Sequence, residues 1–277
     1  MKHPFSSLDG LRIGCVRYLN ARPLIEPYLD APVTSGHTAV HFDHPSALAS
    51  QLASGELDVA LVPVFEALRN PESPIVEGVT ISATDPVWSV FVAHREPDPA
   101  AITDIVLDPA SLTSANLCRV LFAERQERQP RFHREGEGPT DAARLLIGNQ
   151  AIRFREKEES EGWHYLDLAE EWQRLQGGLP FVFAVWLMRP DLPAHADHAA
   201  IAAAFRCIAA EGLEHVEAIA ARHAAAYAPG FSHRYLTEHI RFGMGTREKQ
   251  AMALFRELLI RHHRLQPEVG EKPFIFM

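Results

Sequence analysis

The sequence predicts a two-lobed α/β protein with a central cleft. Three observations favour this class: a length of 277 residues, strand-like and helical segments that alternate along most of the chain, and two strand-like segments placed to connect two lobes. A chain of this length exceeds the usual size of one domain, so two lobes of ordinary dimensions are expected. With 47% hydrophobic and 23% charged residues, the chain has the composition of an ordinary globular protein with a sizeable core.

Local patterns predict the first α/β units. Residues 11–18 are strand-like and run into a turn at Asn20, and Pro23 stands in the first turn of the helix that follows. A second helix opens at His44, and residues 58–63 form a continuous apolar strand. Strand, helix and strand in this order predict a parallel sheet.

The rest of the chain continues the alternation and then becomes helical. Further strand-like runs lie at residues 79–83, 87–94, 105–107, 144–149 and 178–190. A helix is expected from about Ala115, where apolar residues recur at helical spacing. From about residue 194 onward, three helical stretches are predicted, at residues 196–226, 232–242 and 246–262.

This order of elements predicts a discontinuous first lobe and an inserted second lobe. The first lobe would comprise residues 1–92 and 189–277, and the second residues 93–188. The chain would cross between the lobes near residues 89–95 and 184–191. A cleft between two lobes joined by two strands is typical of a ligand site that closes by a hinge motion.

Charge and hydropathy exclude several classes of partner. The formal net charge of −9 disfavours a nucleic-acid surface, which needs a net basic patch. We expect no contact with a membrane, because no segment reaches the roughly 20 apolar residues that a membrane span requires. The N-terminal residues lack the apolar stretch of a signal peptide, so a cytoplasmic location is expected. The sequence does not indicate an oligomeric state.

No cofactor is expected. The 15 histidines include no His-Glu-x-x-His motif and have no accompanying Cys pair, so a metal site is not predicted. The glycine patterns of Rossmann and P-loop nucleotide sites are also absent. An anionic ligand would then be held by a few Arg side chains, by hydroxyls or by the free N–H groups at helix N-termini.

Hydroxyl side chains cluster before one of the expected helices. Ser111, Thr113 and Ser114 stand just ahead of the helix that begins near Ala115. Hydroxyls together with free backbone N–H groups form a carboxylate site at such a helix end. The alternative role is simple N-capping, and both roles are compatible at the same helix end.

Two further polar residues are candidates for the cleft. Asn20, at a strand-to-helix turn, either presents its amide to the cleft or caps the following helix. Ser89 lies in the expected crossover strand and would face the cleft if Val87 and Val90 face the core. The alternative for Ser89 is an ordinary strand serine.

Five segments, in order and spacing, resemble the chorismate dehydratase family. They are Tyr18-Leu-Asn-Ala-Arg-Pro-Leu, Glu56-Leu-Asp-Val-Ala-Leu-Val-Pro-Val, Ser111-Leu-Thr-Ser, Leu145-Leu-Ile-Gly-Asn, and Asp167-Leu-Ala-Glu-Glu-Trp followed by Gly178-Leu-Pro-Phe-Val-Phe-Ala-Val-Trp. The C-terminal Tyr235-Leu-Thr-Glu-His-Ile-Arg-Phe is also similar to the helical tail of the family. The resemblance covers nearly the whole chain and implies a fold like that of type-2 periplasmic binding proteins.

The resemblance implies a hydro-lyase that dehydrates chorismate to 3-[(1-carboxyvinyl)oxy]benzoate in menaquinone biosynthesis by the futalosine pathway. It implies that the enolpyruvyl carboxylate of the substrate takes the proton, that Asn20 is catalytic, and that the substrate is bound by Arg17, Tyr18, Ser89, Ser111, Thr113, Ser114, Gly148 and Asn149. The alternative is a non-catalytic cytoplasmic protein that binds a small carboxylate on the same scaffold. Asn20 and the Ser111-Leu-Thr-Ser loop favour the enzyme.

Three positions depart from the pattern of the resembled family. Arg17 stands where a small or amide residue is usual, Leu112 where an Arg is usual, and Asn149 where an Asp is usual. We hypothesise that Arg17 replaces the positive charge that is missing at Leu112. The competing interpretation pairs Arg17 or Arg22 with an acidic side chain such as Glu26, because an Arg on a core strand is costly unless it is paired.

Overall fold

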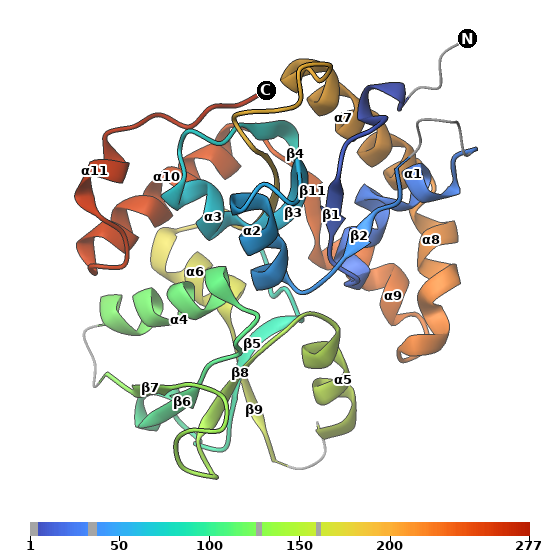
Figure 1. Ribbon diagram of the computed structural model, residues 1–277. Helices are drawn as coiled ribbons and strands as arrows, with labels where there is room; N and C mark the ends of the chain where they lie inside the picture. Colours follow the sequence, from blue (N-terminus) through green and yellow to red (C-terminus); the bar gives the residue numbers. More distant parts are fainter. Residues whose placement is uncertain (1–4, 33–37, 126–128, 159–161) are drawn as a thin grey trace.

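The strands of the protein form two separate sheets. The structure, a computed structural model, describes residues 5–32, 38–125, 129–158 and 162–277. One sheet has six strands in the order β11 (Arg241–Gly243), β4 (Ile75–Ala83), β10 (Phe181–Met188), β3 (Val59–Pro63), β1 (Ile13–Cys15) and β2 (His41–Phe42). The other has five, in the order β7 (Arg131–His133), β6 (Asp104–Val106), β8 (Ala143–Ile147), β5 (Val90–His94) and β9 (His164–Asp167). Figure 1 shows the two sheets in separate lobes, one above the other, so the predicted two-lobed α/β class is confirmed.

Helices cover both sheets. Those of the first lobe are α1 (Glu26–Asp30), α2 (Pro45–Ala53), α3 (Val64–Arg69), α7 (His198–Glu214), α8 (Val216–His223), α9 (Phe231–Arg234), α10 (Thr246–Arg261) and α11 (Pro267–Gly270). Its 3-10 turns are η1 (Ser6–Leu8), η2 (Leu19–Leu24) and η5 (Ala224–Ala226), and a π-helical turn spans Tyr235–His239. The second lobe contains α4 (Leu112–Glu124), α5 (Gly148–Glu158), α6 (Leu168–Gln176) and the 3-10 turn η3 (Pro99–Ala101).

The centre of the first sheet consists of strands that are buried along their length. β1 pairs in parallel with β3, as the order of strand, helix and strand predicts. β10 lies between β3 and β4 and is antiparallel to both. Trp186 of β10 stacks on Phe205 of α7 with ring centroids 4.2 Å apart. The continuous apolar character of β3 and β10 therefore reflects burial on both faces.

The crossovers lie earlier in the chain than predicted. Residues 90–94 belong to the five-stranded sheet and residues 181–188 to the six-stranded sheet, so the connecting segments are residues 84–89 and 177–180. The expected crossovers at 89–95 and 184–191 and the expected lobe boundaries at residues 92 and 188 therefore lie later in the chain than the points where it passes from one sheet to the other. The reason is that an apolar run covered by helices looks the same in either lobe, and only its hydrogen-bonded neighbours assign it.

The C-terminal segment contains a strand where only helix was predicted. The stretch 232–242 divides into α9, the π-helical turn and β11, which pairs antiparallel with β4 at the edge of the sheet. The free edge of β4 offers backbone hydrogen bonds that outweigh the helical preference of these residues. In the described part of the chain, every helix is too short or too polar to cross a bilayer.

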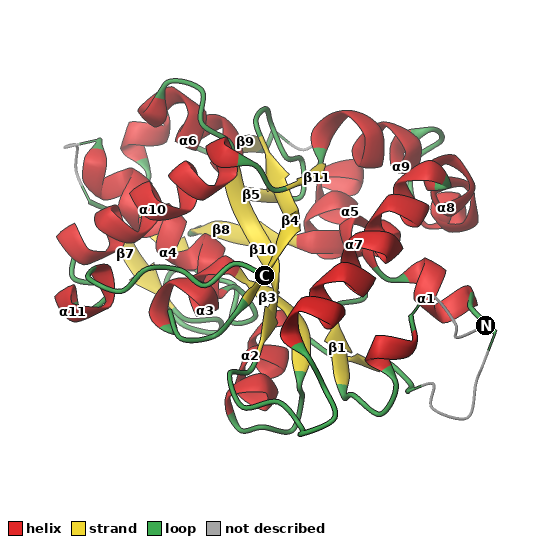
Figure 2. Cartoon of the chain, turned by 90° about the horizontal axis from the view of Figure 1, so that it is seen from above, coloured by secondary structure: helices red, strands yellow, loops and turns green. Residues whose placement is uncertain are grey.

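The two lobes also touch away from the crossovers. At the end of α10, Arg261 and His262 pair with Glu124 of α4, with nitrogen to oxygen distances of 3.2 and 2.6 Å. Figure 2 shows α10 beside α4 from above. These contacts join the two lobes a second time, away from the connecting segments.

Candidate functional site

A cavity lies where the two lobes meet. Its apolar lining comes from both sheets and includes Val16, Leu61, Val62, Ile81, Val87, Val90, Leu112, Ile147 and Phe183. Its polar lining consists of Tyr18, Asn20, Ser89, Ser111, Thr113 and Ser114. Seven of the nine predicted site residues therefore line one cavity, namely these six and Gly148.

One end of the cavity is the N-terminus of α4. Ser111 occupies the N-cap position, yet its hydroxyl makes no capping hydrogen bond and has no partner within the described residues. Ser114 stands one turn further on and is also buried. Thr113 is committed elsewhere, because its Oγ1 accepts a hydrogen bond of 3.1 Å from the N–H of Phe65 in the other lobe. The unused hydroxyl and the free N–H groups of α4 form a neutral site suited to a carboxylate.

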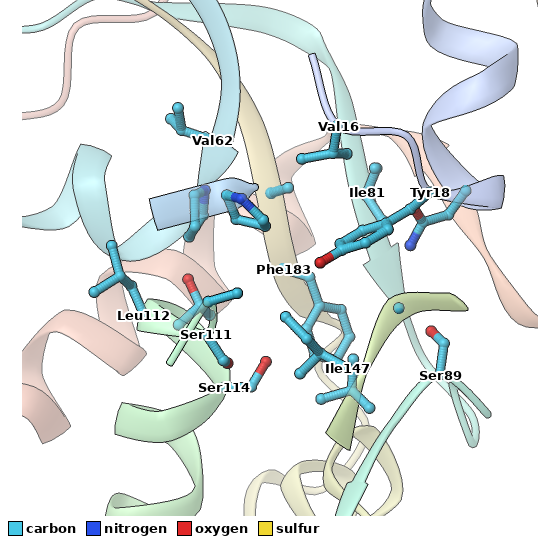
Figure 3. A pocket seen from close by; sticks show the side chains of 18 of the residues that line it. Val16, Tyr18, Val62, Ile81, Ser89, Ser111, Leu112, Ser114, Ile147 and Phe183 are labelled. Carbon is cyan, nitrogen blue, oxygen red and sulfur yellow. The ribbon is translucent and has the colours of Figure 1, made fainter. Parts of the chain in front are cut away.

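The other end of the cavity carries Ser89 and Asn20. In Figure 3, Ser111 and Ser114 lie on one side and Ser89 on the opposite side, with Ile147 and Phe183 between them. The Oδ1 atom of Asn20 is buried and accepts no hydrogen bond from any described residue. Asn20 lies inside η2, whose N-cap is Tyr18, so the alternative role of Asn20 as a helix cap is wrong.

Ser89 reaches the cavity by a different route from the one predicted. Val87 and Val90 line the cavity beside Ser89 instead of turning away from it. The cause is Trp88, whose φ of 65° reverses the chain just before β5 and breaks the alternation of a strand. The Ser89 carbonyl then accepts a 2.8 Å hydrogen bond from the N–H of Gly148.

Asp167 holds this turn in place. Its carboxylate accepts hydrogen bonds from the N–H groups of Val87 (3.1 Å) and Trp88 (2.8 Å) and also caps α6 through the N–H of Ala169 (3.0 Å). Burial raises the pKa of Asp167 to about 6, and these N–H donors oppose the rise. Asp167 was not predicted as a site residue, although an Asp three residues before Glu170 is a helix N-terminus signal that marks the position.

Tyr18 packs directly over Gly148. Burial is the main cause that raises the pKa of the Tyr18 phenol to about 12, and the charge of Asp108 adds to it. Gly148 has a φ of 62°, and a Cβ there would lie 2.8 Å from Cε1 of Tyr18. Both the backbone conformation and the close ring therefore require glycine at the start of α5.

We expect Gly148→Ala to lower the free energy of unfolding more than Gly136→Ala does. Both positions have a positive φ, which costs a non-glycine residue about 1–2 kcal/mol, but a Cβ at Gly136 meets nothing within 4 Å. The clash with Tyr18 should add about 1–3 kcal/mol. Urea unfolding of the two variants measures the difference, and equal losses would contradict the tight packing of Tyr18 on Gly148.

Two predicted substrate contacts lie outside the cavity. The Arg17 side chain is exposed, with its guanidinium over the ring of Phe42, 4.6 Å from the centroid. Val16 and Tyr18 line the cavity, and the residue between them in an extended segment points the other way. Arg17 therefore does not replace the charge missing at Leu112, whereas Arg22 lies 3.8 Å from Glu26, as the competing interpretation proposed.

Asn149 connects the lobes instead of lining the cavity. Its Oδ1 accepts a hydrogen bond of 3.0 Å from the N–H of Leu19, and its Nδ2 donates to the carbonyl of Arg17 at 3.3 Å. An amide can make both bonds because it carries an acceptor and a donor, whereas a carboxylate can only accept. Asn149 thus fixes the backbone on either side of Tyr18.

The site is electrically neutral. Among the described residues that line the cavity there is no Asp, Glu, Lys, Arg or His side chain. Likewise, no group of three or more His, Cys, Asp or Glu side chains in the described ranges is arranged to hold a metal ion. An anion bound here would be stabilised by hydroxyls and helix N–H groups, acting in a low-dielectric space where such dipoles are effective.

Two α/β lobes with a cavity between them are the fold class of the periplasmic binding proteins. Solved structures with the same fold superpose on this chain. A protein from Archaeoglobus fulgidus superposes with a TM-score of 0.70 at 15% identity, covering 91% of this chain and 97% of that one. The periplasmic aliphatic sulphonate binding protein SsuA from Escherichia coli gives 0.62 at 13% identity, with 96% and 92% covered.

Sequence comparison places the chain within a particular family. The sequence profile of the menaquinone biosynthesis family matches residues 11–261, and the chain belongs to that family. The chorismate dehydratase of Thermus thermophilus is 30% identical over 201 residues, which are 65% of this chain and 70% of that protein. The resemblance noted in the sequence is therefore confirmed.

Proposed function

We propose that this protein is a chorismate dehydratase, a hydro-lyase that forms 3-[(1-carboxyvinyl)oxy]benzoate in the futalosine route of menaquinone biosynthesis, in the cytoplasm and without a metal or organic cofactor. Its family and its chorismate dehydratase relative support the proposal. The observation that carries it is the two-ended cavity. Neutral hydrogen-bonding groups stand at opposite ends of an apolar space, and chorismate carries two separate carboxylates, one on its ring and one on its enolpyruvyl side chain.

The proposed reaction needs positioning and dipoles. The C3–H bond breaks, its proton passes to the enolpyruvyl carboxylate and its electron pair forms the C3–C4 double bond. The C4–O bond breaks to release hydroxide, which takes up that same proton from the enolpyruvyl carboxyl group and leaves as water. Negative charge that develops at C3 delocalises into the conjugated ring carboxylate. The N-terminus of α4, with Ser111 and Ser114, would hold that carboxylate and stabilise the charge where it arises.

The opposite end of the cavity would hold the enolpyruvyl carboxylate as proton acceptor. Asn20 and Ser89 line this end. Holding an acceptor next to the C3 proton replaces a bimolecular encounter with a step inside one complex, which lowers the entropic part of the barrier. The apolar wall between the two ends keeps bulk water from the ring.

Incubation of the purified protein with chorismate tests the proposal. We expect an aromatic product whose mass is lower than that of chorismate by one water, with turnover that persists after exhaustive chelation. Titration calorimetry on the same preparation measures binding. Binding of chorismate without turnover would contradict the enzyme and favour the non-catalytic carboxylate-binding protein, and loss of turnover on chelation would contradict the cofactor-free reaction.

A further inference from the structure

A buried tyrosine stands directly behind the Asn20 and Ser89 end of the cavity. Tyr235 opens the π-helical turn, is 1% exposed, and its ring stacks on Phe231 with centroids 5.4 Å apart. It does not line the cavity itself. π-helical turns are uncommon and often occur at functional sites, so the position of Tyr235 in this turn also points to a functional role for its hydroxyl.

The hydroxyl of Tyr235 sets the direction of the Ser89 hydrogen bond. Its Oη donates to Ser89 Oγ at 2.7 Å, and both groups are buried. The phenol is the stronger acid of the two hydroxyls, so it is the hydrogen-bond donor. Burial raises the pKa of Tyr235 further above its usual range, so the phenol keeps its proton. Because Ser89 Oγ accepts this hydrogen, its own hydrogen is available to donate to a group in the cavity.

The same hydroxyl orients Asn20. Burial raises the pKa of the Tyr235 phenol, and Asn20 opposes this rise, as an amide N–H group directed at the phenol oxygen does. With the phenol hydrogen committed to Ser89, Oη can only accept, so Asn20 must present its Nδ2 donor to it. This leaves Oδ1 as the buried atom of Asn20 that no described residue satisfies. The cavity end thus offers one donor, from Ser89, and one acceptor, from Asn20.

We infer that Tyr235 is a positioning residue for the dehydration, because it fixes a donor and acceptor pair at Ser89 and Asn20 that complements a protonated carboxyl group. A carboxylic acid carries one O–H donor and one carbonyl acceptor, whereas a carboxylate would meet Asn20 Oδ1 with like partial charges. The pair therefore interacts more favourably with the enolpyruvyl carboxyl group after it takes the C3 proton than before. An interaction that strengthens along the reaction raises kcat more than it lowers KM. This inference rests on the proposed function.

A double-mutant cycle with Tyr235→Phe and Ser89→Ala tests it. The Phe variant keeps the ring stacked on Phe231 and removes only the hydroxyl. We expect kcat for chorismate to fall on the order of tenfold or more, with KM changed less than kcat. The part of the loss that passes through Ser89 disappears in the double variant, so the combined loss should be smaller than the product of the two single losses.

Tyr28→Phe is the matched control. The Tyr28 ring is also fully buried, and its hydroxyl donates to the Thr38 carbonyl at 3.0 Å, but it does not line the cavity. It should lower the melting temperature without lowering kcat per folded molecule. A Tyr235→Phe protein with wild-type kcat, or rate losses that multiply in the double variant, would overturn the role of Tyr235.

Failure of the proposed function would be recognised separately. If the wild-type protein does not convert chorismate, the proposed function is wrong. The wild type, both single variants and the double variant are then compared by the Kd of 3-[(1-carboxyvinyl)oxy]benzoate, measured by calorimetry. If the double variant loses less binding free energy than the two single variants together, Tyr235 and Ser89 are still coupled at the ligand. Independent losses, or none, overturn it.

Discussion

Asn20→Ala is expected to reduce turnover of chorismate on the order of a hundredfold while changing affinity much less, because positioning acts mainly on the transition state. The structure supports this split. Asn20 Oδ1 is buried at the cavity without a partner among the described residues, so its role is directed at a ligand. Ground-state affinity also draws on Ser111 and Ser114 at the other end.

Asn70→Ala controls for the loss of an asparagine as such. The Asn70 amide donates to the carbonyl of Glu66 at 3.0 Å, at the end of α3 and outside the cavity. We expect this variant to lose about 1 kcal/mol of stability and to keep its turnover. Single-turnover rates and melting temperatures of both variants separate the two effects. A destabilised Asn20→Ala protein with wild-type turnover would remove Asn20 from the catalytic residues.

Asp167→Ala should cause the largest loss of stability among the residues around the site. It leaves the buried N–H groups of Val87, Trp88 and Ala169 without their acceptor. An unsatisfied buried donor costs about 1–3 kcal/mol, so a loss of roughly 3–5 kcal/mol is expected. Release of the turn at Trp88 should also displace Ser89 and slow turnover in the molecules that remain folded.

Asp197→Ala measures the part of this effect that is due to helix capping alone. Asp197 caps α7 by accepting from the N–H of Ala200 at 2.8 Å, in an exposed position. Its loss should cost about 1 kcal/mol, as for other N-caps. Urea unfolding of both variants gives the comparison, and similar losses at the two positions would show that the bonds from Val87 and Trp88 contribute little.

The raised pKa of Asp167 adds a pH dependence to the same experiment. The folded protein, with a pKa of about 6, holds this proton more tightly than the unfolded chain, whose Asp pKa is about 4. Ionisation of Asp167 therefore lowers stability as the pH rises from about 4 to about 6. Asp167→Asn cannot ionise, so the free energy of unfolding of this variant should improve relative to wild type over that interval. Parallel pH profiles would contradict the raised pKa.

Much of the site could be predicted because it is encoded locally. The hydroxyls of Ser111 and Ser114 reach the cavity since they stand at a helix start, which capping preferences mark in the sequence. Asn20 was found by its place between a strand and a turn. The wrong placement of Arg17 has a local cause as well, because the extended segment 16–18 alternates its side chains and Val16 and Tyr18 face the cavity.

Other parts of the site depend on residues far apart in the chain. Tyr235 meets Ser89 across 146 positions of sequence, and Asp167 accepts from Val87 across 80. Nothing in the pattern around Tyr235 distinguishes a positioning hydroxyl from a core aromatic residue. Asn149 likewise reaches Leu19 across 130 positions, so its bridging role was not visible.

The sequence by itself determined the class of the fold, the parallel pairing of β1 with β3 and the helix end that forms one side of the site. These features follow from hydrophobic periodicity and capping, which act within a few residues. Tertiary structure decided which sheet β10 joins, that residues 241–243 form a strand at the edge of β4, and which way Ser89 and Asn20 present their hydrogen-bonding groups. The reason is physical: buried backbone and side-chain polar groups must find partners, and the partners that satisfy them come from distant segments that only folding brings together.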